Sequence, residues 1–197
     1  HGDLHLHHGK LTVSILNPHL REIANQSAAN LYLDATINPT DLELRLDAPI
    51  HVVKQSKTLA MPSIYQVVDI GRMTMQRGQE QSRQAQAIVE HLKQTDPSTK
   101  VIDFKKFQEN ADGAWFRDSR GSNDFMDAKT LIVTGTPCPN ISALRAEYVV
   151  LTGKHPEAED ESFAAFVDRQ ILANVHQCFG RKAGKRFHDG DKIYFLS

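Results

Sequence analysis

The apolar positions along the chain form short runs that alternate with longer segments whose apolar residues recur at steps of three and four. The short runs predict strands, which we place at residues 10–16, 30–33, 50–53, 64–70, 100–104, 113–116, 131–134 and 192–196. The segments with helical period predict helices, which we place at residues 17–28, 39–46, 79–93, 140–151 and 162–175. Because strands and helices alternate throughout, the sequence predicts an α/β fold with a mostly parallel sheet and helices on both faces.

The N-terminal part of the sequence carries the same helix-start signal twice. Asn17-Pro18 and Asn38-Pro39 each place an N-cap residue before a proline at the first helical position. Residues 1–46 are therefore predicted to form strand–helix–strand–helix, a parallel pattern that is too short for a complete nucleotide-binding lobe. Residues 1–9 contain four histidines, whose spacing is a weak signal for a metal site, and we interpret them as a frayed end. Residues 47–63 are predicted to form a strand and a connector.

The segment after residue 162 combines a packed helix with a cluster of cations. Its apolar stripe is typical of a helix on a core and consists of Phe163, Phe166, Val167, Ile171 and Val175. We predict that this helix ends at Gly180, after which four cations fall within six residues. In one interpretation Arg181 presents a rigid guanidinium fork to phosphate oxygens, as an arginine finger does. In the other, Gly180 is a C-cap and the cations are solvated partners of the helix dipole.

Composition and charge limit the class of protein. The chain has 197 residues, of which 40% are hydrophobic and 24% charged, so it is long enough for one sizeable soluble domain or one domain and a fragment. Its net charge of −1 means that any nucleic-acid surface must be local. Two cysteines exclude a disulfide framework and a four-cysteine iron–sulfur cluster. With no long apolar run and no signal peptide, we expect a cytoplasmic protein without a membrane partner, and the first residue, a histidine, suggests a piece of a longer chain.

Polar clusters follow several of the predicted strands. They are Asp34-Ala35-Thr36, Asp118 to Asp124, and Thr134-Gly135-Thr136-Pro137. In an open parallel sheet, the loops beyond the carboxyl ends of the strands form the ligand crevice, so these clusters and Arg181 are predicted to line one edge. Each cluster also has the composition of an ordinary turn. No phosphate loop of the G-x-x-x-x-G-K-[ST] type occurs, since Gly180 to Lys185 is followed by Arg186 and Phe187 and comes after a helix.

These clusters resemble superfamily 2 helicase motifs, in the order in which the helicases carry them. Asp34-Ala35-Thr36 resembles motif III, Arg120-Gly121-Ser122-Asn123 resembles motif V, and Gln177-x-x-Gly180-Arg181 resembles motif VI. Asn17-Pro18 with Asp34-Ala35-Thr36 also looks distantly like the lobe junction of DinG/XPD-like helicases. The runs 115–123 and 135–140 resemble the helicase part of cyanobacterial plasmid replication proteins. The resemblance covers roughly residues 15–197.

The resemblance implies a RecA-like, P-loop NTPase fold and an ATP-dependent DNA helicase used in replication. Residues 1–46 would be the tail of the first lobe, 47–63 a connector, and 64–197 the second lobe. ATP and Mg²⁺ would bind between the lobes, and motifs I and II, with the phosphate loop and the magnesium ligands, would lie in an N-terminal lobe before residue 1. No metal ligands are expected in this chain. Motif VI normally has a second arginine where this chain has Gly184, and Lys185 or Arg186 is a candidate replacement.

The resemblance also assigns roles to individual residues. Catalytic contacts to the phosphates would come from Gln177 and Arg181, and coupling between the lobes from Asp34 and Thr36. The nucleotide would be bound by Gly121, Asn123, Asp124, Gly180 and Arg186. Single-stranded DNA or another nucleic acid would be bound by a cationic groove with aromatic platforms, for which the candidates are Lys105, Lys106, Trp115, Arg120 and Thr136. Alternatively, Trp115 is a core residue and Lys105 and Lys106 lie in a solvated turn.

A second function from another class fits the same residues. The missing phosphate loop and the missing second arginine both allow a non-catalytic RecA-like module that binds nucleic acid or protein. An unrelated α/β nucleotide-binding enzyme is disfavoured because no intact phosphate-binding fingerprint occurs. A structure that shows which loops share one edge of the sheet is the observation that best tests these predictions.

Overall fold

The chain divides into two units, each built from segments that are distant in sequence. A computed structural model describes residues 2–7, 10–32, 38–53, 62–115, 124–182 and 190–197. Unit 1 comprises residues 1–55 and 138–173, and unit 2 comprises residues 56–137 and 174–197. These boundaries differ from the predicted ones at residues 46 and 64, because residues 138–173 are grouped with the N-terminal segment.

Unit 2 contains a five-stranded sheet in which every neighbouring pair of strands is parallel. Its strands lie in the order β3 (Ser63–Val67), β7 (Lys192–Leu196), β6 (Thr130–Thr134), β4 (Lys100–Asp103) and β5 (Gly113–Ala114). All five residues of β6, the central strand, are buried. This burial on both faces explains why β6 appears in the sequence as an uninterrupted apolar run between two threonines. A short 3₁₀ segment, η1 (Lys105–Asn110), follows β4.

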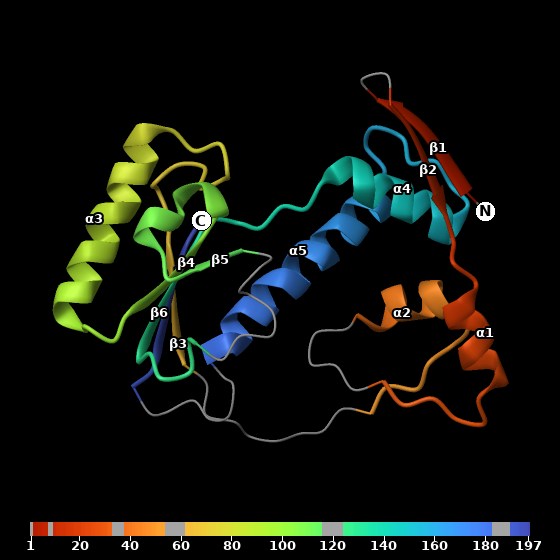
Figure 1. Cartoon of the computed structure of the whole chain (residues 1–197), viewed down its shortest axis with the longest axis horizontal. Helices are drawn as coiled ribbons and strands as arrows, with labels where there is room; N and C mark the ends of the chain where they lie inside the picture. Colours follow the sequence, from red (N-terminus) through yellow and green to blue (C-terminus); the bar gives the residue numbers. More distant parts are fainter. Residues whose placement is uncertain (1, 8–9, 33–37, 54–61, 116–123, 183–189) are drawn as a thin grey trace. The chain divides into compact units, whose positions relative to one another are not determined.

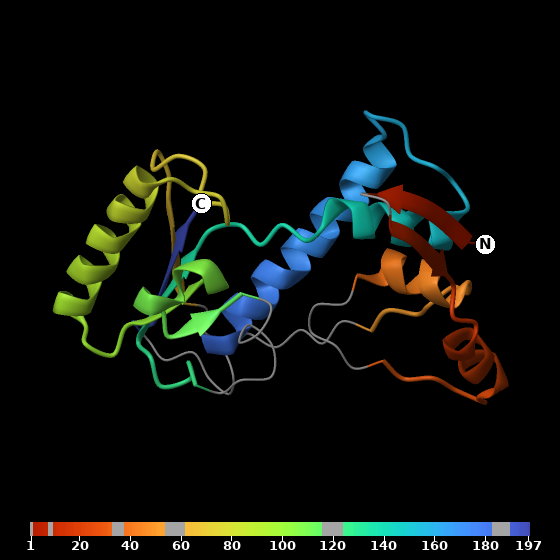
Figure 2. The same ribbon diagram turned by 45° about the horizontal axis from the view of Figure 1, so that its top comes forward.

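Helices cover both faces of this sheet (Figures 1 and 2). On one face, Ala85 and Val89 of α3 (Gln79–Thr95) join a core cluster with Val101, Ile132 and Leu196. On the other face, the Phe179 ring of α5 (Glu161–Lys182) lies edge-on against Phe195 of β7, with ring centroids 5.7 Å apart. Consecutive strand residues point to opposite faces, so Phe195 and Leu196 belong to different layers. The predicted α/β fold class, a RecA-like parallel sheet with helices on both faces, is confirmed.

Unit 1 is mostly helical and contains α1 (His19–Gln26), α2 (Pro39–Leu46), α4 (Ile141–Thr152) and the first turns of α5. Of the two predicted caps, Asn38 is present, because its side chain accepts from Asp41 N. Asn17 is not the cap of α1, since the N-cap is Pro18, and the Asn17 side chain accepts instead from His19 N at 3.0 Å. The Asn140 side chain caps α4 by accepting from Ser142 N and Ala143 N. The apolar core contains Leu144, Tyr148 and Phe166. A buried carboxylate, Asp41, links α2 to α5 by accepting from Arg169 Nε at 2.8 Å and Gln170 Nε2 at 2.7 Å.

The N-terminal segment differs from the predicted strand–helix–strand–helix pattern. Residues 2–7, interpreted from the sequence as a frayed end, form β1 (Gly2–His7), which pairs antiparallel with β2 (Lys10–Ile15). The alternation of apolar and polar residues in 2–7 was the signal for this strand. No strand occurs at residues 30–32 or 50–53 in the described part of the chain, so those predictions were wrong. A short apolar run forms a strand only where a neighbouring strand provides hydrogen-bond partners for its backbone, and these two runs have no such neighbour among the described residues.

Within the described ranges, no helix combines sufficient length with sufficient apolar character to cross a bilayer.

Candidate functional site

The carboxyl edge of the five-stranded sheet gathers polar segments from several parts of unit 2. Because all the strands are parallel, the segments that follow β3, β4, β5 and β6 leave the sheet at the same edge. They bring together the turn before α3, the start of η1, Trp115, and the Thr134-Gly135-Thr136 segment. The predicted convergence of strand-end loops is therefore present for these described segments.

A buried ion pair lies at the centre of this edge. Arg77 donates through Nη1 to Asp103 Oδ1 at 2.7 Å and through Nη2 to Asp103 Oδ2 at 2.6 Å. The two side chains are only 4% and 9% exposed, respectively. Arg77 Nε also donates to Ser82 Oγ at 3.3 Å, and the guanidinium carbon lies 3.7 Å from the centroid of the Phe107 ring. The Phe107 ring therefore packs against the face of the guanidinium group, and the Asp103 carboxylate binds its edge.

Burial and hydrogen bonding act in opposite directions on the Asp103 carboxyl. Burial is the largest effect and raises the pKa of Asp103 above its ordinary value, while the Arg77 hydrogen bonds and charge and the Phe104 backbone N–H lower it. Phe104 N donates to Asp103 Oδ1 at 2.7 Å. The carboxylate thus depends on Arg77 for most of the compensation that a buried charge needs.

A small hollow of about 150 Å³ adjoins this ion pair and is lined by Arg77, Asp103, Lys106, Phe107 and Thr134, among others. Thr134, at the end of β6, is 1% exposed, and its Oγ1 is the one buried side-chain polar atom in the described part of the chain without a hydrogen-bond partner. An unpaired buried hydroxyl is costly, but Thr134 Oγ1 has less than 1 Å² of accessible surface and so does not itself open onto the hollow. The hollow is below the 300–1,000 Å³ that is common for sites of drug-sized ligands.

The backbone at Gly135 connects three loops of the edge. Gly135 N donates to Leu196 O at 2.7 Å, and Thr136 N donates to Met73 O at 3.2 Å, which joins the ends of β6 and β7 to the turn before α3. Gly135 has φ of +81°, and a Cβ there would lie 2.4 Å from Met73 O and 2.5 Å from the Phe104 ring. Only glycine fits this position, because the strand-end loops approach each other too closely for any side chain.

The predicted nucleic-acid residues divide into exposed and buried groups. Lys105 and Lys106, at the start of η1, are exposed at the carboxyl edge, and Thr136 is half-buried. Two exposed ammonium groups at such an edge are available to phosphate oxygens.

Trp115 contradicts the prediction that it stacks on nucleic-acid bases. Its side chain is buried, at 3% exposure, and its indole Nε1 donates to Thr134 O at 2.8 Å. A stacking platform requires an open ring face, which this tryptophan does not have. The core interpretation of Trp115 is correct, and its role is to hold the segment after β5 against the end of β6.

Helix α5 does not end at Gly180. It continues through Gly180 to Lys182, and a Cβ at Gly180 would meet no atom within 4 Å. The C-cap interpretation of Gly180 was therefore wrong, because a C-cap glycine adopts a positive φ and Gly180 does not. The Arg181 backbone belongs to the last turn of α5, and its side chain lies outside the described part of the structure.

The course of α5 places its motif VI-like residues along the sheet. Because β6 and β7 are parallel, the chain must return to the amino edge before β7 begins, and the end of α5 is on this return path. Phe179 contacts Phe195, the next-to-last residue of β7, so this turn lies beside the carboxyl half of that strand. Gln177, which is half-buried, precedes this point, and Arg181 follows it by half a turn.

Most of the remaining predicted site residues lie outside the part of the chain that the structure describes. Asp124 is exposed at the beginning of a described segment. The others lie outside the described residues: Asp34, Thr36, Arg120, Gly121, Asn123 and Arg186. Among the described residues, no group of three or more histidine, cysteine, aspartate or glutamate side chains is arranged to hold a metal ion.

The sequence interpretation did not include Arg77 and Asp103. The sequence held one signal for Asp103, because this carboxylate follows Val101 and Ile102 in the predicted apolar strand 100–104. A carboxylate in a buried strand requires a cationic or hydrogen-bonding partner. The identity of that partner was not readable, because Arg77 is 26 positions away in a turn rich in polar residues.

Comparison of the chain with protein-family models, with curated proteins and with solved structures found no match.

Proposed function

We propose that this chain supplies the second RecA-like lobe of an ATP-dependent DNA helicase or translocase that acts in replication. The observation that carries the proposal is the parallel sheet itself, which collects the segments after β3, β4, β5 and β6 at one edge while α5 carries Gln177 past the carboxyl half of β7. The sequence after β5 resembles motif V and the end of α5 resembles motif VI, in the order of superfamily 2 helicase motifs. In open α/β sheets this edge is where ligands bind.

In this proposal the chain contributes one side of an ATP site. Gln177 and Arg181 approach the phosphates from this lobe, and Gly121, Asn123, Asp124, Gly180 and Arg186 contribute further nucleotide contacts. The hollow of about 150 Å³ beside Asp103 is too small to enclose ATP, which supports a nucleotide held against the edge by a second lobe. ATP and Mg²⁺ would supply the phosphoryl-transfer chemistry, and Asp34 and Thr36 would couple the lobes.

Nucleic-acid contacts would come from cations that flank the same edge. Lys105 and Lys106 are exposed there, and Arg120 and Thr136 complete the proposed set. Trp115 is removed from this set because its ring is buried. Because the proposed set contains few cations and the chain has a net charge of −1, binding to single-stranded DNA should be weak and should decrease as salt increases.

ATP turnover tests the catalytic part of the proposal. The isolated chain, which has no phosphate loop, should hydrolyse no ATP. In the full-length protein, Arg181→Ala should lower kcat by about 10³–10⁵ if Arg181 is an arginine finger, with thermal unfolding unchanged. Arg181→Lys should also fail, because a point charge cannot replace the guanidinium fork. Arg83→Ala, an exposed arginine of α3, is the control and should retain full turnover.

Turnover by the isolated chain would disprove this assignment. Full turnover by the Arg181→Ala protein, combined with a lower melting temperature, would show that Arg181 has only a structural role.

Single-stranded DNA binding tests the nucleic-acid part. Replacing Lys105 and Lys106 by alanine should weaken binding and reduce its dependence on salt, since fewer counterions are released. Lys129→Ala is a matched control, because Lys129 is an exposed lysine just before β6, at the opposite edge of the same sheet. Fluorescence anisotropy with a labelled oligonucleotide measures both. Binding that is indifferent to salt, or equally weakened by Lys129→Ala, would contradict the groove assignment.

A non-catalytic RecA-like module that binds nucleic acid or protein is the second candidate. It is favoured by a specific observation in unit 1, where the strands β1 and β2 expose large aliphatic side chains. Normal DNA binding without any ATP turnover in the full-length protein would favour this candidate over a helicase.

A further inference from the structure

The β1–β2 hairpin has one face that is almost entirely aliphatic. Leu4 lies opposite Val13, Leu6 lies opposite Leu11, and Ile15 lies opposite Gly2. Residues directly opposite each other in an antiparallel pair point to the same side, so these five side chains form one surface, which we call the apolar hairpin face. Each of them is between 56% and 74% exposed.

The opposite face of the hairpin is the one that packs within unit 1. Asp3 and Ser14, which alternate with the aliphatic residues, are half-buried, and both strands contact α4 (Figure 1). A two-stranded sheet normally buries its apolar face and exposes its polar one. Here the arrangement is reversed, which leaves the apolar hairpin face without a cover in the described part of the chain.

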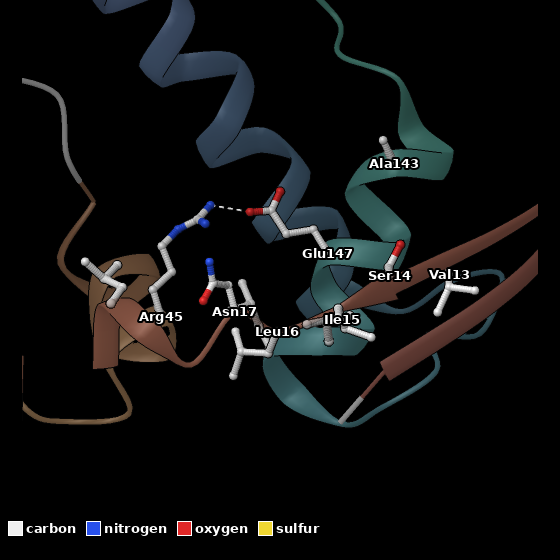
Figure 3. A pocket seen from close by; sticks show the side chains of 11 residues that line it. Val13, Ser14, Ile15, Leu16, Asn17, Arg45, Ala143 and Glu147 are labelled. Carbon is white, nitrogen blue, oxygen red and sulfur yellow. Dashed lines mark hydrogen bonds and ion pairs between the residues drawn. The ribbon is translucent and has the colours of Figure 1, made fainter. Parts of the chain in front are cut away.

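Helix α1, which follows the hairpin in the chain, also exposes apolar side chains. Leu20 and Ile23 of this helix are about half exposed, and none of its residues is buried. A hollow of about 540 Å³ is lined by β2, the start of α1 and α4, and Figure 3 shows Ile15 and Ala143 among its lining residues. The same hollow is lined by Arg45 and Glu147, which form an ion pair with each other.

The hairpin face is at the upper end of what a soluble monomer normally exposes. At these exposures its five residues present roughly 500 Å² of apolar area, within the 300–600 Å² of the largest patch on most monomers, and Leu20 and Ile23 add roughly 200 Å² on α1. A stable interface of standard size uses about 800 Å² on each partner. Because little more than half of a typical interface is apolar, the exposed apolar area together with its polar neighbours is sufficient for one side of a specific interface.

We propose that the apolar hairpin face and α1 dock onto the same surface of a second copy of this chain. A flat two-stranded ribbon with one aliphatic face can pack against its own copy, as the inner faces of two sheets do at about 10 Å. The hollow beside it offers each copy a pocket for an aliphatic anchor of the other.

Charge also favours a second copy as the occupant. The net charge of −1 gives two copies almost no mutual repulsion, which favours self-association. Arg45 and Glu147 give the surface one cation and one anion, both partly exposed. Because these two charges already pair with each other, the polar part of the surface is neutral and does not repel the same surface of a second copy.

Sedimentation equilibrium of the full chain, measured across a range of concentrations, tests the proposal. The wild-type chain should show a reversible transition from a 22.1 kDa monomer to a species of twice that mass. Leu6→Lys and Val13→Lys place a charge in the centre of the face and should each raise the dimer Kd by at least about tenfold. Thr12→Lys makes a similar change on the same strand, at an exposed position that faces the other way, and should leave the Kd unchanged.

Far-UV circular dichroism of all three variants separates loss of docking from loss of folding, since each substituted residue is exposed. A chain that stays monomeric at all concentrations would overturn the proposal and would mean that another molecule covers the face. A dimer that Leu6→Lys and Val13→Lys leave intact, or that Thr12→Lys disrupts equally, would overturn it as well.

Discussion

Replacing Arg77 by methionine removes the only cation that contacts Asp103 among the described residues. The methionine keeps an unbranched apolar stem against Phe107 but leaves the Asp103 carboxylate buried, with the Phe104 N–H as its remaining hydrogen-bond donor. A buried carboxylate without its counter-ion must either remain charged at a high cost or bind a proton. We therefore expect Arg77→Met to destabilise unit 2 strongly at neutral pH.

The magnitude follows from the burial of the pair. With side chains only 4% and 9% exposed, Arg77 and Asp103 lie in the regime where loss of one partner costs about 3–5 kcal/mol of unfolding free energy. An exposed ion pair would contribute about 0–1 kcal/mol. Replacing both partners by apolar residues, as in Arg77→Met with Asp103→Leu, should recover most of the loss, because no charge is then left buried.

Urea denaturation followed by tryptophan fluorescence measures this effect directly. Trp115 is the single tryptophan of the chain and is buried in unit 2, so its emission reports the unfolding of the sheet. Arg83→Met is the matched control, because Arg83 pairs with Glu80 but the two side chains are 79% and 56% exposed. This control should have a midpoint close to that of the wild type.

Two results would refute the reasoning. A loss below about 1 kcal/mol for Arg77→Met would mean that the pair behaves as a solvated one. A double variant that is as unstable as Arg77→Met alone would mean that the lost stability comes from packing around Arg77 and not from the unpaired charge on Asp103.

Two further predictions concern the same edge. Because burial raises the pKa of Asp103 above its unfolded value of 3.8, its contribution to stability is fully present below that pH and is lost as pH rises through the folded-state pKa. Urea titrations at increasing pH give the unfolding free energies of the wild type and of Asp103→Asn. The wild-type value minus the variant value should fall as pH rises from 3.8 through the folded-state pKa of Asp103. A difference that rises with pH would contradict the raised pKa of Asp103. Gly135→Ala should cost about 2–4 kcal/mol, since its Cβ would lie 2.4 Å from Met73 O at a φ of +81°. Gly180→Ala, inside α5 with open space beside it, should instead stabilise the protein by about 0.5–1 kcal/mol. The melting temperature should therefore fall for Gly135→Ala and rise for Gly180→Ala, and shifts of the same sign and size would contradict the backbone conformations described for these two glycines.

The sequence by itself determined the elements whose signals are local. The step of three and four in residues 79–93 identified α3, and the asparagines at 38 and 140 marked the starts of α2 and α4, because capping involves groups within three residues of each other. The uninterrupted apolar run of β6 indicated a strand buried on both faces. The alternation of strands and helices predicted the parallel α/β class. The position of the candidate site at the strand ends also followed from this class.

Only the tertiary structure decided which side chains meet at that site. The partner of Asp103 lies 26 positions away, the indole of Trp115 turns inward to Thr134, and α5 continues past Gly180, which does not adopt the positive φ of a C-cap. The hairpin was missed for a related reason, since β1 gains its backbone hydrogen bonds from β2 and not from its own residues. In each case the deciding free energy is that of burial or pairing with a group that becomes a neighbour only after the chain has folded.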